Sequence, residues 1–213
     1  MSERLPIAVL VSGTGTNLQA LLDTVHGREA EIVAVASSAP GVRALERAGE
    51  HGVACRSFAR GDYDGRAARD QAMGDWIEGH GARLIVLAGY MELLGSPFLE
   101  RFPAGVINVH PSLLPAFPGL GAIEQALAYG VKVFGITVHF VDAGVDTGPV
   151  ILQRAIELPD ARDPEEVLRA LRPIEHALLP QAVALAAQGA LRADPENPRR
   201  TLLGHQAPVV DEG

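Results

Sequence analysis

An asparagine and a histidine stand two residues apart at the end of a short apolar run, a spacing that could serve chemistry. Asn108 and His110 follow the apolar residues 105–107, and Pro111 comes directly after them. On a β-strand, residues two apart point to the same face, and proline ends the strand because it has no N–H for the ladder. An amide donor beside a titratable imidazole can stabilise an oxyanion and move a proton, as acyl-type transfer requires.

An aspartate in a later turn could act on this histidine. Asp146 is the only acid in the turn Val145-Asp146-Thr147-Gly148-Pro149. A nearby carboxylate favours the charged form of an imidazole, so we expect Asp146 to hold His110 protonated. Each residue also has an ordinary structural alternative: a packed histidine, an asparagine that caps a loop, or an aspartate in an Asx turn. The residues alone leave these alternatives open.

A glycine-rich loop near the N-terminus is a second candidate binding element. An apolar run ends in Ser12-Gly13-Thr14-Gly15-Thr16-Asn17, called here the glycine loop, before a predicted helix. Glycines let the backbone turn tightly and leave N–H groups at a helix N-terminus, where they can hold phosphate. The loop lacks the third glycine of a dinucleotide fingerprint, because position 18 is Leu18, and it lacks the Gly-Lys-Ser/Thr ending of Walker A. It suits a single phosphate group better; a turn whose glycines serve only geometry is the alternative.

The elements that must position these residues alternate between strand and helix. Buried strands are predicted at 5–11, 31–37, 53–58, 83–89 and 105–110. Amphipathic helices are predicted near 17–26, 41–51, 64–80 and 91–101. This alternation predicts an α/β, Rossmann-like fold with a mostly parallel sheet flanked by helices. In such sheets ligands bind beyond the carboxyl ends of the strands, which is where Asn108 and His110 would lie.

The pattern changes after residue 110. A proline-rich loop at 111–119 and a short helix at 121–130 precede two strands, 132–141 and 149–157. Their short connection predicts an antiparallel pair in the C-terminal half. A long helix follows at 163–189, with Pro173 and Pro180 as sites for a kink, and a polar tail begins at about residue 194.

Composition limits the classes of protein to which the chain can belong. Its 213 residues suit one domain, and the net charge of −8 argues against a nucleic-acid partner. Anionic small molecules stay possible, because the local field of a pocket can oppose the net charge. Cys55 is the only cysteine, which excludes an intramolecular disulfide and a cysteine-based zinc site and favours a cytoplasmic protein. No apolar run approaches the roughly 18 residues of a membrane span.

From the glycine loop to Glu175-His176, the chain resembles the folate-dependent formyltransferases. The core motif, residues 108–115 with the Asp146 turn, is shared by related formyl-group enzymes. The glycine loop narrows the resemblance to members that act on glycinamide ribonucleotide in purine biosynthesis. The resemblance implies transfer of a formyl group from the co-substrate 10-formyltetrahydrofolate to the amine of that ribonucleotide, without a metal. It also implies one formyltransferase domain, with a phosphate-binding half at 1–104, a catalytic and folate-binding half at 105–190, and a tail at 191–213.

The resemblance assigns roles to residues that match the family's motifs. It implies three catalytic residues, Asn108, His110 and Asp146, with His139 in a supporting place. It implies a ribonucleotide site made of Gly13, Gly15, Thr16, Asn17 and Glu175. It implies a folate site made of Arg66, Met91, Glu92, Leu93, Leu94 and Asn108. Two positions depart from the pattern: Glu92 stands where arginine is common, and Gly121 stands where many relatives have histidine. We expect recognition by backbone groups to survive both changes, and side-chain contacts at these positions to be lost.

Three other functions share part of this pattern. Formyltetrahydrofolate hydrolase has the same trio but carries an N-terminal regulatory module, whereas the first strand here is predicted at about residue 5. Methionyl-tRNA formyltransferase adds a C-terminal tRNA-binding domain and needs a basic surface. A non-enzymatic nucleotide-binding module explains the glycine loop but leaves the trio without a role. We therefore expect two small-molecule substrates as partners, and neither nucleic acid nor a membrane. We expect the protein itself to be a monomer or a dimer.

Overall fold

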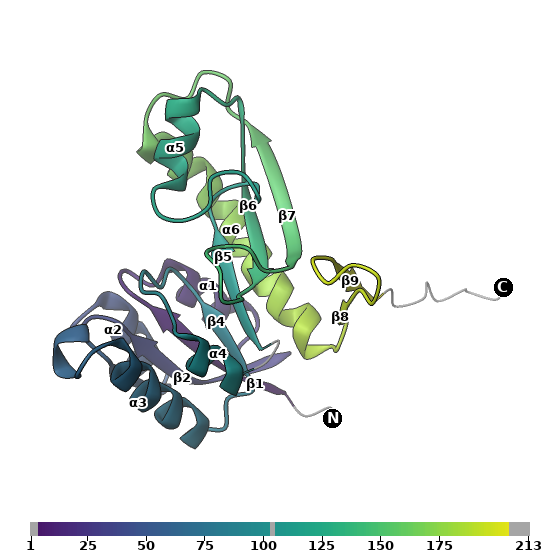
Figure 1. The fold of residues 1–213 in the computed structure, drawn as a ribbon. Helices are drawn as coiled ribbons and strands as arrows, with labels where there is room; N and C mark the ends of the chain where they lie inside the picture. Colours follow the sequence, from purple (N-terminus) through teal and green to yellow (C-terminus); the bar gives the residue numbers. More distant parts are fainter. Residues whose placement is uncertain (1–3, 103–104, 205–213) are drawn as a thin grey trace.

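Seven strands form one sheet that runs through the molecule (Figure 1). The computed structural model describes residues 4–102 and 105–204. The strands of this sheet are β1 (Leu5–Val11), β2 (Ala30–Ser37), β3 (Ala54–Ser57), β4 (Leu84–Leu87), β5 (Val106–His110), β6 (Val133–Phe140) and β7 (Val150–Glu157). They lie in the order β3-β2-β1-β4-β5-β6-β7. The pairs from β3 to β5 are parallel, and β6 and β7 are antiparallel to each other, as the sequence predicts. β6 is also antiparallel to β5, which the sequence did not predict.

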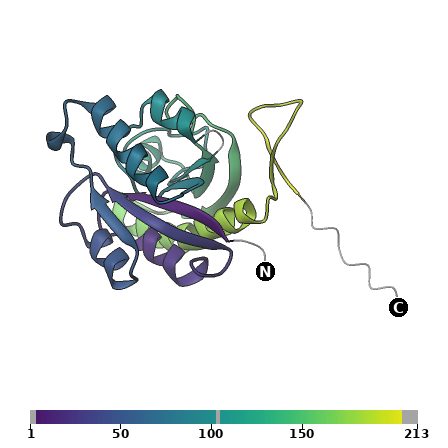
Figure 2. The same cartoon turned by 90° about the horizontal axis from the view of Figure 1, so that it is seen from below.

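Helices cover both faces of the sheet, because its central strands are apolar on both sides. The helices are α1 (Thr16–Thr24), α2 (Arg43–Glu50), α3 (Arg66–Gly79), α4 (Ser96–Arg101), α5 (Ala122–Tyr129) and α6 (Pro164–Ala187), with a 3₁₀ turn at Arg60–Asp62. Ile7 and Val9 of β1 pack in the cluster that includes α1, α2, α5 and α6, whereas Ala8 and Leu10 face α3 and α4. Figure 2 shows this division, with α3 on one side of the sheet and α1 and α6 on the other.

The helix predicted at 91–101 is wrong in its first half. The observed α4 begins at Ser96, and residues 91–95 form no helix or strand. Pro97 lies in the first turn of α4, where its fixed φ and missing N–H suit a helix start. The apolar side chains within 91–94 line a pocket, described below, and do not form one face of a helix.

The C-terminal region differs from the predicted tail in one respect. Two short strands, β8 (Leu191–Ala193) and β9 (Thr201–Leu203), pair as a hairpin. Arg200 of this hairpin forms a bridge to Val150 of β7. The rest of the predicted tail, 205–213, lies outside the described residues. The long helix α6 is not ended by Pro173 or Pro180. Within residues 4–102 and 105–204, no helix is long and apolar enough to cross a membrane.

Candidate functional site

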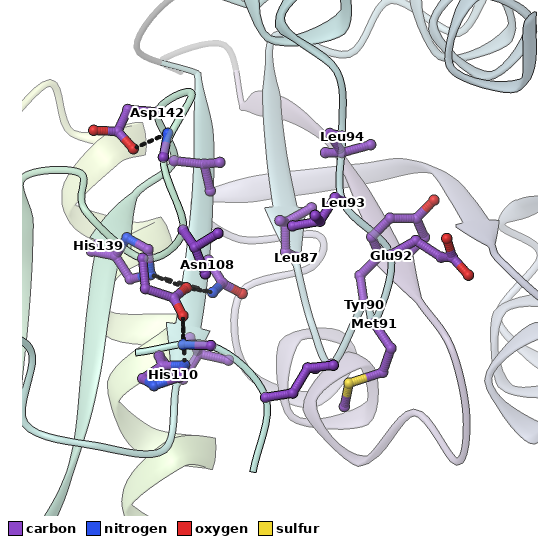
Figure 3. A pocket seen from close by; sticks show the side chains of 18 of the residues that line it. Leu87, Tyr90, Met91, Glu92, Leu93, Leu94, Asn108, His110, His139 and Asp142 are labelled. Carbon is purple, nitrogen blue, oxygen red and sulfur yellow. Dashed lines mark hydrogen bonds and ion pairs between the residues drawn. The ribbon is translucent and has the colours of Figure 1, made fainter. Parts of the chain in front are cut away.

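A pocket of about 520 Å³ opens where β4 and β5 end and two loops from the second half of the chain meet them (Figure 3). Its polar side chains include Asn108, His110, His139 and Asp146. Its apolar wall consists of Leu87, Met91, Leu93, Leu94, Leu120, Val141 and Val145. A mostly apolar pocket with a few convergent polar groups is the usual form of a small-molecule site.

Asn108 and His139 lie side by side on neighbouring strands. Asn108 of β5 pairs in register with His139 of β6, so their side chains share one face of the sheet. The amide nitrogen of Asn108 lies 3.3 Å from His139 Nε2 and 3.4 Å from Asp146 Oδ1. Both distances are long for hydrogen bonds of this kind. A ligand oxygen could therefore displace either contact at little cost.

His110 is buried, and each of its ring nitrogens faces an acceptor. Nε2 lies 2.9 Å from the carbonyl oxygen of Phe117, and Nδ1 lies 3.3 Å from Asp146 Oδ2. A carbonyl and a carboxylate can only accept, whereas a neutral imidazole has one N–H to donate. Only the protonated ring satisfies both contacts, so the geometry fits a cationic His110.

Asp146 is held as a carboxylate by several donors. Burial raises its pKa, but a hydrogen bond from His139, the backbone N–H of Gly119 and the charges on His110 and His139 lower that pKa to about 2. The Gly119 N–H donates to Asp146 Oδ2 over 2.8 Å. Asp146 itself has φ 52°, a left-handed conformation that aspartate tolerates better than most residues. This turn brings the carboxylate between the two histidines.

The predicted folate residues line the opposite side of the same pocket. Arg66, Met91, Glu92, Leu93 and Leu94 all contribute to its wall. Met91 and Leu93 are 67% and 60% exposed, so a ligand could cover them. The carboxylate of Glu92 points away from Asn108 and His110 in Figure 3, and it pairs with Arg69 behind the loop. Gly121, the second departure from the family pattern, has φ 70° at the N-cap of α5, a conformation that suits glycine.

The predicted ribonucleotide residues gather at a neighbouring place that does not line this pocket. Gly15 has φ 72°, and a Cβ there would come 2.7 Å from that of Ala44, so this glycine serves local packing. A Cβ on Gly13 would meet nothing within 4 Å. Asn17 is buried at the start of α1. Glu175 of α6 lies near it: burial raises the pKa of Glu175, opposed by the amide of Asn17 and the charge of Arg172.

The structure also shows contacts that the sequence did not predict. The Phe117 carbonyl and the Gly119 N–H orient His110 and Asp146, and both belong to the loop before α5. Phe117 has φ 53°, which no sequence signal indicates. Ser12 joins the two binding regions, because its Oγ accepts a hydrogen bond of 2.9 Å from the N–H of Met91.

Comparisons with known proteins agree with this architecture. Phosphoribosylglycinamide formyltransferase of Bacillus subtilis is 39% identical over 83% of this chain and 91% of its own length. The trifunctional purine biosynthetic protein adenosine-3 of Drosophila melanogaster is also 39% identical over 89% of this chain, which spans only 14% of that longer protein.

Two solved structures show the same fold. Glycinamide ribonucleotide transformylase 1 from Symbiobacterium toebii superimposes with a TM-score of 0.91 at 42% identity, covering 96% of both chains. Formyltetrahydrofolate deformylase from Burkholderia mallei gives a TM-score of 0.83 at 31% identity, covering 95% of this chain and 71% of that one. The formyl transferase family model matches residues 5–183, and the chain therefore belongs to the formyl transferase family.

Proposed function

We propose that this protein transfers the formyl group of 10-formyltetrahydrofolate to the amine of glycinamide ribonucleotide, giving formylglycinamide ribonucleotide and tetrahydrofolate. The observation that carries the proposal is the meeting of Asn108, His110 and Asp146 at one wall of a mostly apolar pocket. A pocket of this size and lining suits a pteridine ring. The relatives named above as phosphoribosylglycinamide formyltransferases support the choice of substrates.

In the proposed reaction the substrate amine attacks the formyl carbon. A C–N bond forms to the ribonucleotide, and the carbonyl electrons move to oxygen to give a tetrahedral intermediate. The Asn108 amide and the protonated His110 stabilise this oxyanion. The bond from carbon to the folate nitrogen then breaks, while the attacking amine loses one proton and the folate nitrogen gains one. His110, with water, carries that proton.

Two further residues are proposed to serve these steps indirectly. Asp146, ionised at neutral pH because its pKa is about 2, keeps His110 cationic by its negative charge. His139 helps to hold Asp146 in place, since its Nε2 lies 3.5 Å from Asp146 Oδ1. Its Nδ1–H donates to the Phe140 carbonyl over 2.7 Å, which fixes the ring.

The ribonucleotide would bind at the glycine loop, within the half at 1–104. Gly13 is exposed, and open space surrounds its Cα, so a phosphate can approach the backbone there. Among the described residues, the buried Asn17 Oδ1 has no hydrogen-bond partner. An unpaired buried oxygen is costly, so a donor on the ligand would satisfy it. Thr16 and Glu175 complete the proposed site.

One assay tests the proposal against its nearest alternative. Protein, 10-formyltetrahydrofolate and glycinamide ribonucleotide are mixed, and tetrahydrofolate is followed by absorbance with and without the ribonucleotide. Release that depends on the ribonucleotide supports the transferase. Release without it identifies a hydrolase, the activity suggested by the deformylase relative. The free thiol of Cys55 agrees with a cytoplasmic location, which we propose with the function.

A further inference from the structure

The loop that forms one wall of the pocket has almost no hydrogen bonds of its own backbone. This segment, residues 89–95, is called here the pocket loop. Among the described residues, no backbone–backbone hydrogen bond is made by residues 89–94. Side chains from other elements hold it instead. The N–H of Gly95 donates to Asp70 Oδ2 over 2.8 Å, and the carbonyl of Leu93 accepts from Arg69 over 3.2 Å. The N–H of Met91 donates to Ser12 Oγ, as described above. The shape of this wall therefore depends on a few side chains.

Arg69 supports the pocket loop through several hydrogen bonds. It lies on α3, behind the pocket loop, and is 1% exposed. Its Nε and Nη2 donate to Asp70 Oδ1 over 3.1 and 2.8 Å, and its Nη1 donates to Glu92 Oε2 over 3.1 Å. With the Leu93 carbonyl, four of its five N–H donors have acceptors. A buried guanidinium stays charged and is tolerated only when paired in this way.

The pair with Glu92 also decides where that carboxylate lies. Glu92 lines the pocket, and a free carboxylate there would repel the anionic tail of a folate. Arg69 draws it to the rear of the loop and offsets part of its charge, since the same guanidinium also pairs with Asp70. The exposed Met91 and Leu93 are left to face the ligand. Arg69 thus acts on both the shape and the charge of the wall without lining the pocket itself.

We propose that Arg69 is a positioning residue for folate binding, which holds the pocket loop through the Leu93 carbonyl and withdraws the Glu92 carboxylate from the ligand. The proposal rests on the proposed function, because it takes the pocket to be the folate site. Its effect should fall on one substrate only, because the contacts of Arg69 described above lie on the pocket loop and α3, not in the glycine loop or the trio. A purely structural role would not separate the two substrates.

The chain offers a matched control in Arg101 of α4. Its guanidinium contacts α3 through Asp75, over 2.7 Å, and through Glu78. Like Arg69 it pairs with carboxylates of α3, although it is more exposed, and among the described residues its hydrogen bonds all go to α3 and none to the pocket loop. Arg101→Met therefore removes an arginine that bonds to α3 without removing the support of the pocket.

The experiment measures binding of 10-formyltetrahydrofolate by calorimetry without ribonucleotide, then KM for each substrate and kcat. We expect Arg69→Met to raise the Kd and KM for the folate by about tenfold or more, with the ribonucleotide KM and kcat within about twofold of wild type. Arg69→Lys keeps the charge but not the fork of donors, so it should give a smaller rise. Arg101→Met should leave all four quantities within about twofold.

Arg69→Met leaves Asp70 buried without its partner, so folding is measured by thermal melting. If that variant does not fold, Arg69→Met is combined with Asp70→Asn, which removes the stranded charge but keeps a side-chain oxygen that can accept from the Gly95 N–H. The folate-specific loss is expected in this double variant too. Equal losses for both substrates, no loss, or a similar loss in Arg101→Met would overturn the proposal. Wild-type protein that does not bind the folate would overturn the proposed function instead.

Discussion

At the scale of single residues, the acceptor atoms around His110 determine which of its ring nitrogens can donate a proton. Its two ring nitrogens meet the Phe117 carbonyl and the Asp146 carboxylate, neither of which can donate. In the proposed mechanism, this arrangement lets the ring donate from both nitrogens, stabilise an oxyanion and transfer a proton. The residue types in the sequence indicate the contact between Asp146 and His110. The contact with the Phe117 carbonyl could not be predicted, because it depends on a left-handed backbone conformation at Phe117.

Replacement of His110 by alanine should lower kcat by about 10²–10⁴, the usual contribution of a positioned acid or oxyanion donor. Because His110 is buried and bonded at both nitrogens, some loss of stability is also expected, and the unfolding midpoint is measured beside the rate. His80→Ala is the control, since the ring of His80, at the C-cap of α3, bonds to the Trp76 carbonyl and packs on the Trp76 ring, and His80 does not line the pocket. If the His110 variant keeps more than about a third of the wild-type kcat, His110 has no catalytic role.

Asn108→Ala should lower kcat more than it raises either KM, because an oxyanion donor acts mainly in the transition state. The amide contacts of Asn108 at 3.3 and 3.4 Å are weak, so the folded state should lose little. Steady-state kinetics with both substrates separate the two parameters. An effect on KM alone would make Asn108 a binding residue.

Asp146→Asn removes the charge but keeps the shape, and asparagine also tolerates the left-handed φ of this position. The pKa of Asp146 is lowered from 3.8 to about 2, so it contributes stability above pH 4 that is lost as the pH falls toward 2. The contribution is about 2 kcal/mol at neutral pH. The variant should lose this pH dependence, its His110 titration should move to lower pH, and its activity should fall. NMR titration and urea unfolding at pH 3 and 7 measure these effects.

Asp142→Asn, in the same loop, is the control for this variant. Asp142 lines the pocket, but among the described residues its side chain accepts hydrogen bonds only from Gly144 and Thr147 of its own turn. Its replacement should therefore leave the His110 titration unchanged. An unmoved titration in Asp146→Asn would remove the electrostatic role of Asp146. An unchanged rate would remove Asp146 from the mechanism.

At the scale of elements, the glycine loop contains one glycine, Gly13, that is proposed to bind phosphate and one, Gly15, that serves packing. Gly13→Val should raise the KM for the ribonucleotide by about tenfold or more and leave the folate KM unchanged, because its Cβ would enter open space where phosphate is expected. Gly15→Ala should instead lower the melting temperature, since its Cβ would meet Ala44 at 2.7 Å with φ 72°. Equal rises in both KM values for Gly13→Val would contradict the phosphate assignment.

The regular elements were predictable because each has a local pattern, and the pocket loop was not. The strands and most helices lie within a few residues of their predicted bounds. The apolar side chains of Met91, Leu93 and Leu94 line the pocket rather than one face of a helix, and Pro97 lies in the first turn of the helix that starts later. The contact between Arg69 and Glu92 joins residues 23 positions apart. No local pattern encodes such a pair, so the sequence placed Glu92 at the pocket but gave no sign of its partner Arg69.

At the scale of the whole molecule, the sheet order creates the site. The change from parallel to antiparallel pairing at β5 and β6 brings His139 into register with Asn108. The short turn in the sequence predicts that β6 and β7 are antiparallel to each other, but it does not predict that β6 pairs antiparallel to β5, which depends on packing over the full sheet. The meeting of Asn17 with Glu175 likewise depends on α6 packing beside α1. The resemblance to a family predicts that these residues, distant in the sequence, lie in the same sites, whereas hydrophobic periodicity alone does not predict this.

The hairpin β8–β9 has a consequence for solubility. An open sheet ends in strands whose outer N–H and C=O groups can pair with another chain, and proteins protect such edges with charges or a covering segment. β7 is one edge of this sheet; it carries Arg154 and Glu157, and the hairpin meets it at Val150 through the bridge from Arg200.

A chain that ends at Ala190 should therefore keep its pocket but form larger assemblies than the full chain, measurable by light scattering over a range of concentrations. A chain that ends at Gly204 keeps the hairpin and serves as the control. Equal assembly sizes for both would mean that the charges of β7 protect the edge without help. In the intact protein, we expect the hairpin to reduce aggregation by limiting the addition of a strand from another chain to the edge strand β7.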